Sequence, residues 1–138
     1  MDAADRINLL FGGMTKLAPG ADDETLQVLH RLPQRRFDVI VDAGCGTGRQ
    51  TIALARELDT LVHAVDSHQP FLDDLVRFAG DAPIEVHCMD MQDIPQRFQN
   101  IYLLWSEGAA YSIGFANALA TWAPALRPGA FAVVSERS

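Results

Sequence analysis

The sequence has little of the chemistry that marks disulfide-linked or metal-binding proteins. It contains two cysteines, Cys45 and Cys88, and neither belongs to a Cys-x-x-Cys pair. Reduced thiols in a cytoplasmic protein are therefore the expected state. The four histidines lack the spacing of a metal site along the chain. We predict no metal site and expect each histidine to be isolated, either packed in the core or at the surface.

Positive charge and long apolar runs are also scarce. The formal net charge is −7, and the only adjacent basic pair is Arg35–Arg36. Because an acidic protein repels phosphate backbones, no nucleic-acid partner is expected. No apolar run is long enough to span a bilayer, and the first residues show no signal-peptide pattern, so no membrane partner is expected.

What the sequence does have is an alternation of short β-branched runs with helical stretches, over a length of 138 residues that suits one domain. Numbering the expected strands along the chain, we predict a doubly wound, Rossmann-like parallel α/β sheet of order 3-2-1-4-5. The expected strands are 37–41, 61–65, 84–88, 101–105 and 130–134, and the expected helices are 4–12, 22–32, 49–58, 70–79 and 113–126. No strand follows the fifth, so one sheet edge should be open, and a homodimer through that edge is predicted.

Three glycines at alternate positions follow the first expected strand. The stretch from Val39 to Gly48 runs from a buried strand through Gly44, Gly46 and Gly48 into a helix. Glycines here allow unusual backbone conformations and let the main chain approach a ligand closely. The helix that follows offers free N–H groups. Asp42, at the strand end, can order this loop or reach a ligand amine.

Polar residues also follow the next three strands, and such strand ends converge on the ligand crevice of doubly wound folds. Asp66 ends the second strand, where a carboxylate can accept hydrogen bonds from two ribose hydroxyls. Asp90 and Met91 follow the third strand and can hold an adenine ring by its edge and face. Ser106 and Glu107 follow the fourth. The sequence therefore predicts a nucleotide-type cofactor site.

Each of these residues also has a plainer interpretation. Asp66 can be a helix N-cap or a solvated acid, Asp90 can be a helix cap or a turn acid, and Met91 can fill the core. Glu107 can be a general base, a partner for a substrate ammonium or a structural hydrogen-bond acceptor, and we favour the structural interpretation. Tyr111 can border the substrate or pack in the core. The joint placement of the four motifs at strand ends favours the cofactor site.

The glycine spacing separates two classes of cofactor. A dinucleotide site of the Gly-x-Gly-x-x-Gly type would need a glycine at position 49, where this chain has Arg49. The third glycine comes one residue earlier, at Gly48. An NAD-dependent oxidoreductase is therefore the runner-up.

The segment Val41–Gly48 resembles the first motif of class I S-adenosylmethionine-dependent methyltransferases. Further segments are similar to one bacterial branch of small-molecule methyltransferases; these are residues 17–25, 45–51, 64–72, 104–115 and 128–136. The resemblance covers nearly the whole chain. It implies S-adenosylmethionine as cofactor and a small molecule as methyl acceptor.

The resemblance also implies individual roles. The three glycines would line the methionine and ribose portion of the cofactor, Asp66 would hold the ribose, and Asp90 with Met91 would hold adenine. Ser106 and Glu107 would face the methyl group and the substrate. The chain would divide into an N-terminal helical cap, residues 1–36, and an S-adenosylmethionine-binding domain, residues 37–138, packed as one compact unit.

The sequence departs from the family at its end. The chain stops at Ser138, where family members normally continue into the final strands of the sheet, including an antiparallel one. The alternative function is therefore a truncated cofactor-binding domain or a pseudoenzyme without turnover.

Overall fold

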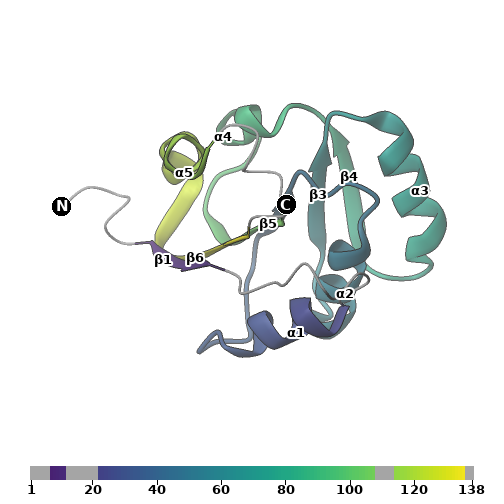
Figure 1. Cartoon of the computed structure of the whole chain (residues 1–138), viewed down its shortest axis with the longest axis horizontal. Helices are drawn as coiled ribbons and strands as arrows, with labels where there is room; N and C mark the ends of the chain where they lie inside the picture. Colours follow the sequence, from purple (N-terminus) through teal and green to yellow (C-terminus); the bar gives the residue numbers. More distant parts are fainter. Residues whose placement is uncertain (1–6, 12–21, 108–113, 136–138) are drawn as a thin grey trace.

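The protein is built on one parallel sheet of six strands. The structure is a computed structural model that describes residues 7–11, 22–107 and 114–135. Every neighbouring pair of strands is parallel, in the order β1-β6-β5-β2-β3-β4 (Figure 1). The strands are β1 (Asn8–Phe11), β2 (Ile40–Ala43), β3 (Val62–Asp66), β4 (Ile84–Cys88), β5 (Ile101–Glu107) and β6 (Leu126–Ser135).

The five strands expected from the sequence occur in the expected order. Starting from β4, the sheet runs β4, β3, β2, β5 and β6, which is the predicted order 3-2-1-4-5. The fold class, a doubly wound Rossmann-like α/β sheet, is confirmed. One further strand, β1, lies beyond β6. The edge that was expected to be open is therefore paired, and the structural reason given for a homodimer through it was wrong.

Strand β1 replaces part of a helix predicted over residues 4–12. Asn8 to Phe11 pair in parallel with Phe131 to Val134 of β6, and Asn8 Nδ2 donates a hydrogen bond to the Gly129 carbonyl at 3.1 Å. The sequence Asn-Leu-Leu-Phe is a short apolar run, and such a run has no period that separates a helix from a strand. Pairing with a strand more than a hundred residues away decides the outcome.

Helices cover both faces of the sheet because side chains alternate along each strand. Helices α1 (Asp22–His30) and α2 (Arg49–Leu58) pack with strand residues such as Ile40, Val62 and Trp105 on one face. Helix α3 (Gln69–Ala79) packs against Ala64 on that same face. The short α4 (Ile94–Arg97) and α5 (Phe115–Trp122) cover the opposite face, around Val41 and Val65. The 3₁₀ turns η2 (Met91–Asp93) and η4 (Ala123–Ala125) lead into α4 and β6.

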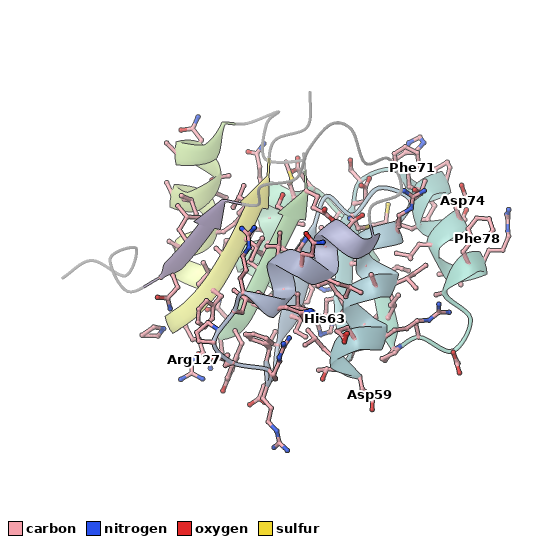
Figure 2. The ribbon with its side chains drawn as sticks, turned by 60° about the horizontal axis from the view of Figure 1, so that its bottom comes forward. Asp59, His63, Phe71, Asp74, Phe78 and Arg127 are labelled. Atoms are coloured by element: carbon pink, nitrogen blue, oxygen red, sulfur yellow. The ribbon has the colours of Figure 1, made fainter. Side chains whose placement is uncertain are left out.

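Helix α3 shows how the pattern of apolar residues places a helix on the sheet. Pro70 lies in its first turn, and Leu72, Leu75 and Ala79 are buried at helical spacing. Phe71 and Phe78 lie on the exposed side of α3 (Figure 2). Among the described residues, none of the helices has both the length and the apolar character needed to cross a membrane.

Candidate functional site

The candidate site lies where β2, β3 and β5 end. These strands are neighbours in the sheet, with β2 between β3 and β5, and all run in the same direction. Their last residues therefore come together at one edge of the sheet. This edge carries Asp42 and the glycine loop after β2, Asp66 at the end of β3, and Ser106 with Glu107 at the end of β5.

Backbone hydrogen bonds hold the glycine loop against β3. The N–H groups of Gly44 and Cys45 both donate to the Val65 carbonyl, at 2.8 and 3.0 Å. The N–H of Gly46 donates to Asp66 Oδ2 at 2.9 Å. The loop is thus shaped before any ligand arrives.

Gly46 and Gly48 both have positive φ angles, but the space available to a side chain differs between them. At Gly48, φ is 86°, and an added Cβ would overlap the Leu75 side chain of α3, with the Leu75 Cγ only 2.8 Å away. At Gly46, φ is 59°, and nothing lies within 4 Å of an added Cβ. Gly48 therefore serves helix packing, whereas the backbone at Gly46 faces open space that a ligand can enter.

Asp42 is fully buried beneath the loop. Its Oδ2 accepts hydrogen bonds from the Thr51 hydroxyl at 2.6 Å and from Gln50 Nε2 at 3.2 Å. Burial raises the pKa of Asp42 to about 7, and the negative charges of Glu107 and Asp66 add to this rise, while the bonds from Thr51 and Gln50 oppose it. The environment of Asp42 therefore destabilises its ionised form relative to its protonated form.

Three buried side-chain atoms of the described residues have no hydrogen-bond partner, and all belong to this region. They are Asp42 Oδ1, Trp105 Nε1 and Ser106 Oγ. Asp42 and Trp105 are register partners on β2 and β5, and Ser106 follows Trp105. Asp42 and Trp105 project from one face of the sheet and Ser106 from the other. Because buried polar atoms are nearly always paired, Asp42 Oδ1 and Ser106 Oγ, at the strand ends, indicate that a ligand or water completes their bonding there.

Helix α1 also contributes to the site, which the sequence did not indicate. The buried hydroxyl of Thr25 lies 3.3 Å from both carboxylate oxygens of Glu107 and donates to them. This contact supports the structural interpretation of Glu107. Thr25 gave no signal in the sequence, because the contact joins residues 82 positions apart.

Asp66 and Asp90 both accept hydrogen bonds from nearby backbone N–H groups. Asp66 Oδ1 accepts from the N–H of His68 at 2.8 Å, so both of its carboxylate oxygens bind backbone N–H groups. Each oxygen still has lone-pair capacity for a further donor. Asp90 Oδ1 accepts from the N–H of Gln92 at 2.8 Å and caps η2. The cap interpretation fits Asp90, whereas the N-cap residue of α3 is His68 and not Asp66.

Met91 is fixed through its backbone. Its side chain is partly buried against the core, and its carbonyl accepts a hydrogen bond from Trp122 Nε1 at 2.8 Å. The ribose and adenine roles expected of Asp66, Asp90 and Met91 stay predictions. Tyr111 lies outside the described residues.

Comparison with known families decides where the chain belongs. A methyltransferase domain family matches residues 40–129, which span β2 to β6 and include the glycine loop. The chain belongs to this family. No curated protein matches the sequence significantly.

Solved structures share the fold of this methyltransferase domain. A protein of Methanococcus maripaludis, provisionally assigned as an S-adenosyl-L-methionine-dependent methyltransferase, is 21% identical with a TM-score of 0.72, over 88% of this chain and 57% of that one. An S-adenosylmethionine-dependent methyltransferase from Thiobacillus denitrificans, solved with S-adenosyl-L-homocysteine, is 20% identical with a TM-score of 0.66, over 80% and 47%. A precorrin 8w decarboxylase from Methanobacterium thermoautotrophicum is 20% identical with a TM-score of 0.67, over 88% and 63%.

At these identities the likeness shows the fold alone, and a fold hosts more than one activity. The chain spans about half to two thirds of the length of these three proteins.

Proposed function

We propose that the methyltransferase domain binds S-adenosylmethionine at the ends of β2, β3 and β5 and transfers its methyl group to a small molecule. The observation that carries the proposal is the crowding of carboxylates at this edge. Burial is the main cause that raises the pKa of Asp42, and the negative charges of Glu107 and Asp66 raise it further, so both carboxylates repel a negative charge on Asp42. A ligand that brings positive charge would relieve this repulsion.

S-adenosylmethionine fits that requirement better than a dinucleotide does. Its sulfonium and ammonium groups outweigh its carboxylate, so its net charge is positive, whereas the pyrophosphate of NAD outweighs the positive nicotinamide ring and makes that cofactor negative. The unpartnered Asp42 Oδ1 and Ser106 Oγ offer acceptors to the ammonium or to a water bound by it. The glycine spacing, which lacks a glycine at position 49, favours the same cofactor.

The remaining contacts follow from the shape of the edge. The open space above Gly46 lies next to Asp66, whose carboxylate retains capacity for the two ribose hydroxyls. Asp90 and Met91 follow β4, the strand beside β3, and would receive the edge and the face of the adenine ring. Gly44, Gly46 and Gly48 would line the methionine and ribose portion.

The protein's task in the reaction is alignment. The sulfonium makes the methyl group electrophilic, so the acceptor needs only to be held in line with it. Ser106 and Glu107 would lie toward the methyl group and the acceptor. Burial, with the charges of Asp42 and Asp66, raises the pKa of the Cys45 thiol, so this residue stays protonated and is not a nucleophile. A general base is required only for an acceptor that is protonated at working pH.

Calorimetric titration of the folded protein with S-adenosylhomocysteine tests the proposal. We expect saturable binding to the wild type and a loss of affinity of about tenfold to a hundredfold in Asp66→Ala, the range for hydrogen bonds to charged groups. Asp66→Asn, which keeps the size of the side chain, should lose less. Asp81→Ala, which changes an exposed acid outside the site, is the matched control and should bind as the wild type does.

Two outcomes would contradict the proposal. One is saturable binding of NADH with no binding of S-adenosylhomocysteine, which would support the oxidoreductase alternative. The other is a folded wild type that binds neither ligand. Release of S-adenosylhomocysteine from S-adenosylmethionine with amine, phenol and carboxylate acceptors then tests turnover. Binding without release from any acceptor would support a cofactor-binding domain without turnover.

A further inference from the structure

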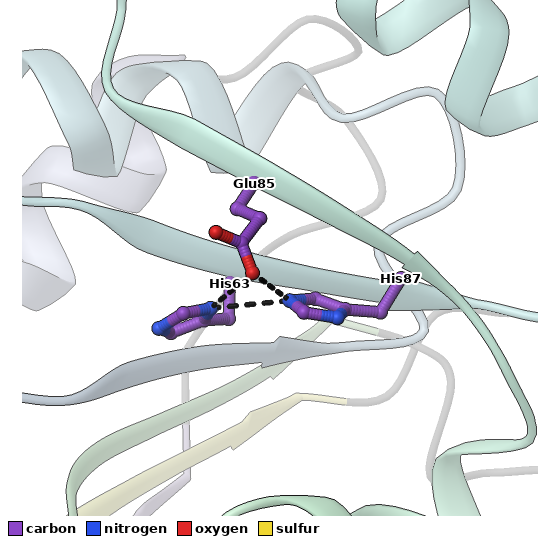
Figure 3. Close-up of side chains that lie close together, drawn as sticks. All are labelled: His63, Glu85 and His87. Carbon is purple, nitrogen blue, oxygen red and sulfur yellow. Dashed lines mark hydrogen bonds and ion pairs between the residues drawn. The ribbon is translucent and has the colours of Figure 1, made fainter.

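Two histidines and a glutamate meet on the face of the sheet that carries α4 and α5. His63 lies on β3, and Glu85 and His87 lie on β4. His63 is the register partner of Glu85, and Val65 is the partner of His87, so all three side chains project from one face. Figure 3 shows their polar atoms pointing toward one another. The histidines were expected to be isolated, which is wrong for His63 and His87.

The distances match a set of ligands around a common centre. His63 Nδ1 lies 3.1 Å from His87 Nε2, His87 Nε2 lies 3.1 Å from Glu85 Oε1, and His63 Nδ1 lies 3.7 Å from Glu85 Oε1. Ligand atoms bound at about 2.0–2.1 Å to a tetrahedral zinc ion lie about 3.3–3.4 Å from each other. The measured triangle brackets that separation, and each residue contributes one atom to it.

Hydrogen bonds between two neutral imidazoles and a carboxylate leave two lone pairs of this triangle facing each other. A hydrogen on His87 Nε2 can be shared between His63 Nδ1 and Glu85 Oε1, but these two acceptors then face each other across 3.7 Å. A hydrogen on His63 Nδ1 instead leaves a lone pair of His87 Nε2 facing the Glu85 oxygen at 3.1 Å. A cation at the centre meets three lone pairs at once.

The surroundings fix the two imidazole rings and keep them neutral. The Phe98 ring contacts both, with centroids 5.1 Å from His63 and 5.0 Å from His87. Burial lowers the pKa of both histidines, which favours the neutral imidazole that binds metal ions.

We propose that His63 Nδ1, His87 Nε2 and Glu85 Oε1 bind one divalent transition-metal ion of the zinc class. Two imidazoles and a carboxylate suit such an ion better than Mg²⁺ or Ca²⁺, which prefer oxygen ligands. The Glu85 side chain is 56% exposed, so water can complete the coordination. The ion would clamp the edge strand β4 to β3. His63 and Asp66 project from opposite faces of β3, so this site is separate from the proposed cofactor site.

Metal binding by the full chain tests the proposal, with Zn²⁺, Co²⁺ and Mg²⁺ as probes on protein first treated with EDTA and dialysed. We expect one Zn²⁺ per chain by calorimetry, and visible absorption of a tetrahedral type when Co²⁺ is added. At a hundredfold excess over Kd, Zn²⁺ should raise Tm by roughly 5–10 °C. Mg²⁺ at the same concentration should leave Tm unchanged.

The ligands are tested one at a time with variants that keep side-chain size. His63→Gln, His87→Gln and Glu85→Gln should each lower Zn²⁺ affinity by about a hundredfold or more, because loss of a group that merely supports a ligand already lowers it roughly 10–100-fold. Glu85→Gln changes an exposed position and should fold even if a histidine variant does not. The controls His68→Gln and Cys88→Ser change exposed groups outside the triangle and should bind Zn²⁺ as the wild type does.

A folded wild type that binds no Zn²⁺ would overturn the proposal and leave a hydrogen-bonded histidine pair. Zn²⁺ binding of equal strength in all the variants would overturn it too, since that binding would lie elsewhere on the surface. Titration with S-adenosylhomocysteine in EDTA is independent of these results.

Discussion

Strand β3 carries His63 near its start and Asp66 at its end. The groups that surround these two residues differ in charge. His63 faces a histidine and a carboxylate at 3.1 and 3.7 Å, so unlike groups converge on one point. Asp66 lies with Asp42 and Glu107, so like charges converge on one edge. The first arrangement is complete once one small cation is added. The second is left with unpartnered buried atoms that need a larger ligand with several polar groups.

The largest loss of stability is expected from a substitution in the glycine loop at the end of β2. Gly48→Ala should destabilise the fold by about 2–5 kcal/mol, because the residue must keep a left-handed conformation and its Cβ overlaps the buried Leu75. Gly46→Ala is the matched variant, since its Cβ meets open space, and it should lose only about 1–2 kcal/mol. Urea unfolding measures both.

The order of the two glycine variants should reverse when ligand affinity is measured in place of the free energy of unfolding. Gly46→Ala places a methyl group where the ligand approaches. It should therefore weaken S-adenosylhomocysteine binding more than Gly48→Ala does, although it destabilises the fold less. Equal affinity of Gly46→Ala and wild type would show that the open space above Gly46 is not the ligand's place.

The next effect comes from the charge at Asp42. Its pKa is raised from the usual value near 3.9 to about 7, so the fold is most stable with this group protonated and loses that stability as pH rises from about 4 to about 7. Asp42→Asn should therefore stabilise the protein at pH 8 by up to about 4 kcal/mol and give almost no gain near pH 4. Urea unfolding at the two pH values measures the difference.

The same substitution should weaken binding of S-adenosylhomocysteine at pH 8, because the ammonium group loses a negative partner. A gain in stability that is equal at pH 4 and pH 8 would contradict the charge at Asp42. So would a gain in stability with unchanged ligand affinity.

Two buried tryptophans provide a smaller and well-matched comparison. Trp122 Nε1 donates to the Met91 carbonyl at 2.8 Å, whereas the buried Trp105 Nε1 has no partner. Both changes to phenylalanine remove packing, but only Trp122→Phe breaks a hydrogen bond. We expect Trp122→Phe to cost about 1–2 kcal/mol more in unfolding free energy than Trp105→Phe. A larger loss in Trp105→Phe would mean that its N–H has a partner in solution.

The smallest expected effect concerns β1, far from both polar sites. Asn8→Ala removes the bond to the Gly129 carbonyl and should cost about 0.5–1.5 kcal/mol, with faster amide exchange in β1. Affinities for S-adenosylhomocysteine and Zn²⁺ should not change. Unchanged exchange in β1 would contradict the pairing of Asn8 with β6.

The sequence predicts the parts of this molecule that depend on local pattern. The run from Val39 to Gly48 indicates strand, loop and helix in order, and the helix at 49–58 has the bounds that were expected. The same pattern places Asp42, Asp66 and Ser106 at strand ends that meet. The alternation of strands and helices predicts a parallel sheet with helices on both faces, because crossovers are right-handed. The order of the five strands is that of one class of doubly wound fold.

The sequence does not predict contacts that depend on register or on distant pairing. His63 and His87 are 24 residues apart, and only the alignment of β3 with β4 brings them together. The Asn8–Phe11 segment becomes a strand because it pairs with the edge of β6. Thr25 reaches Glu107 because α1 packs on the sheet face from which alternate residues of β5 project. None of these outcomes is encoded in a local period.

We propose that β3 serves two separate ligands, a cationic cofactor at its end and a metal ion near its start. Titration with S-adenosylhomocysteine in EDTA, on wild type, Asp66→Ala and His87→Gln, separates the two sites. We expect wild type and His87→Gln to bind with equal affinity and Asp66→Ala to bind at least about tenfold more weakly. Equal binding in Asp66→Ala, or loss of binding in a folded His87→Gln, would contradict it.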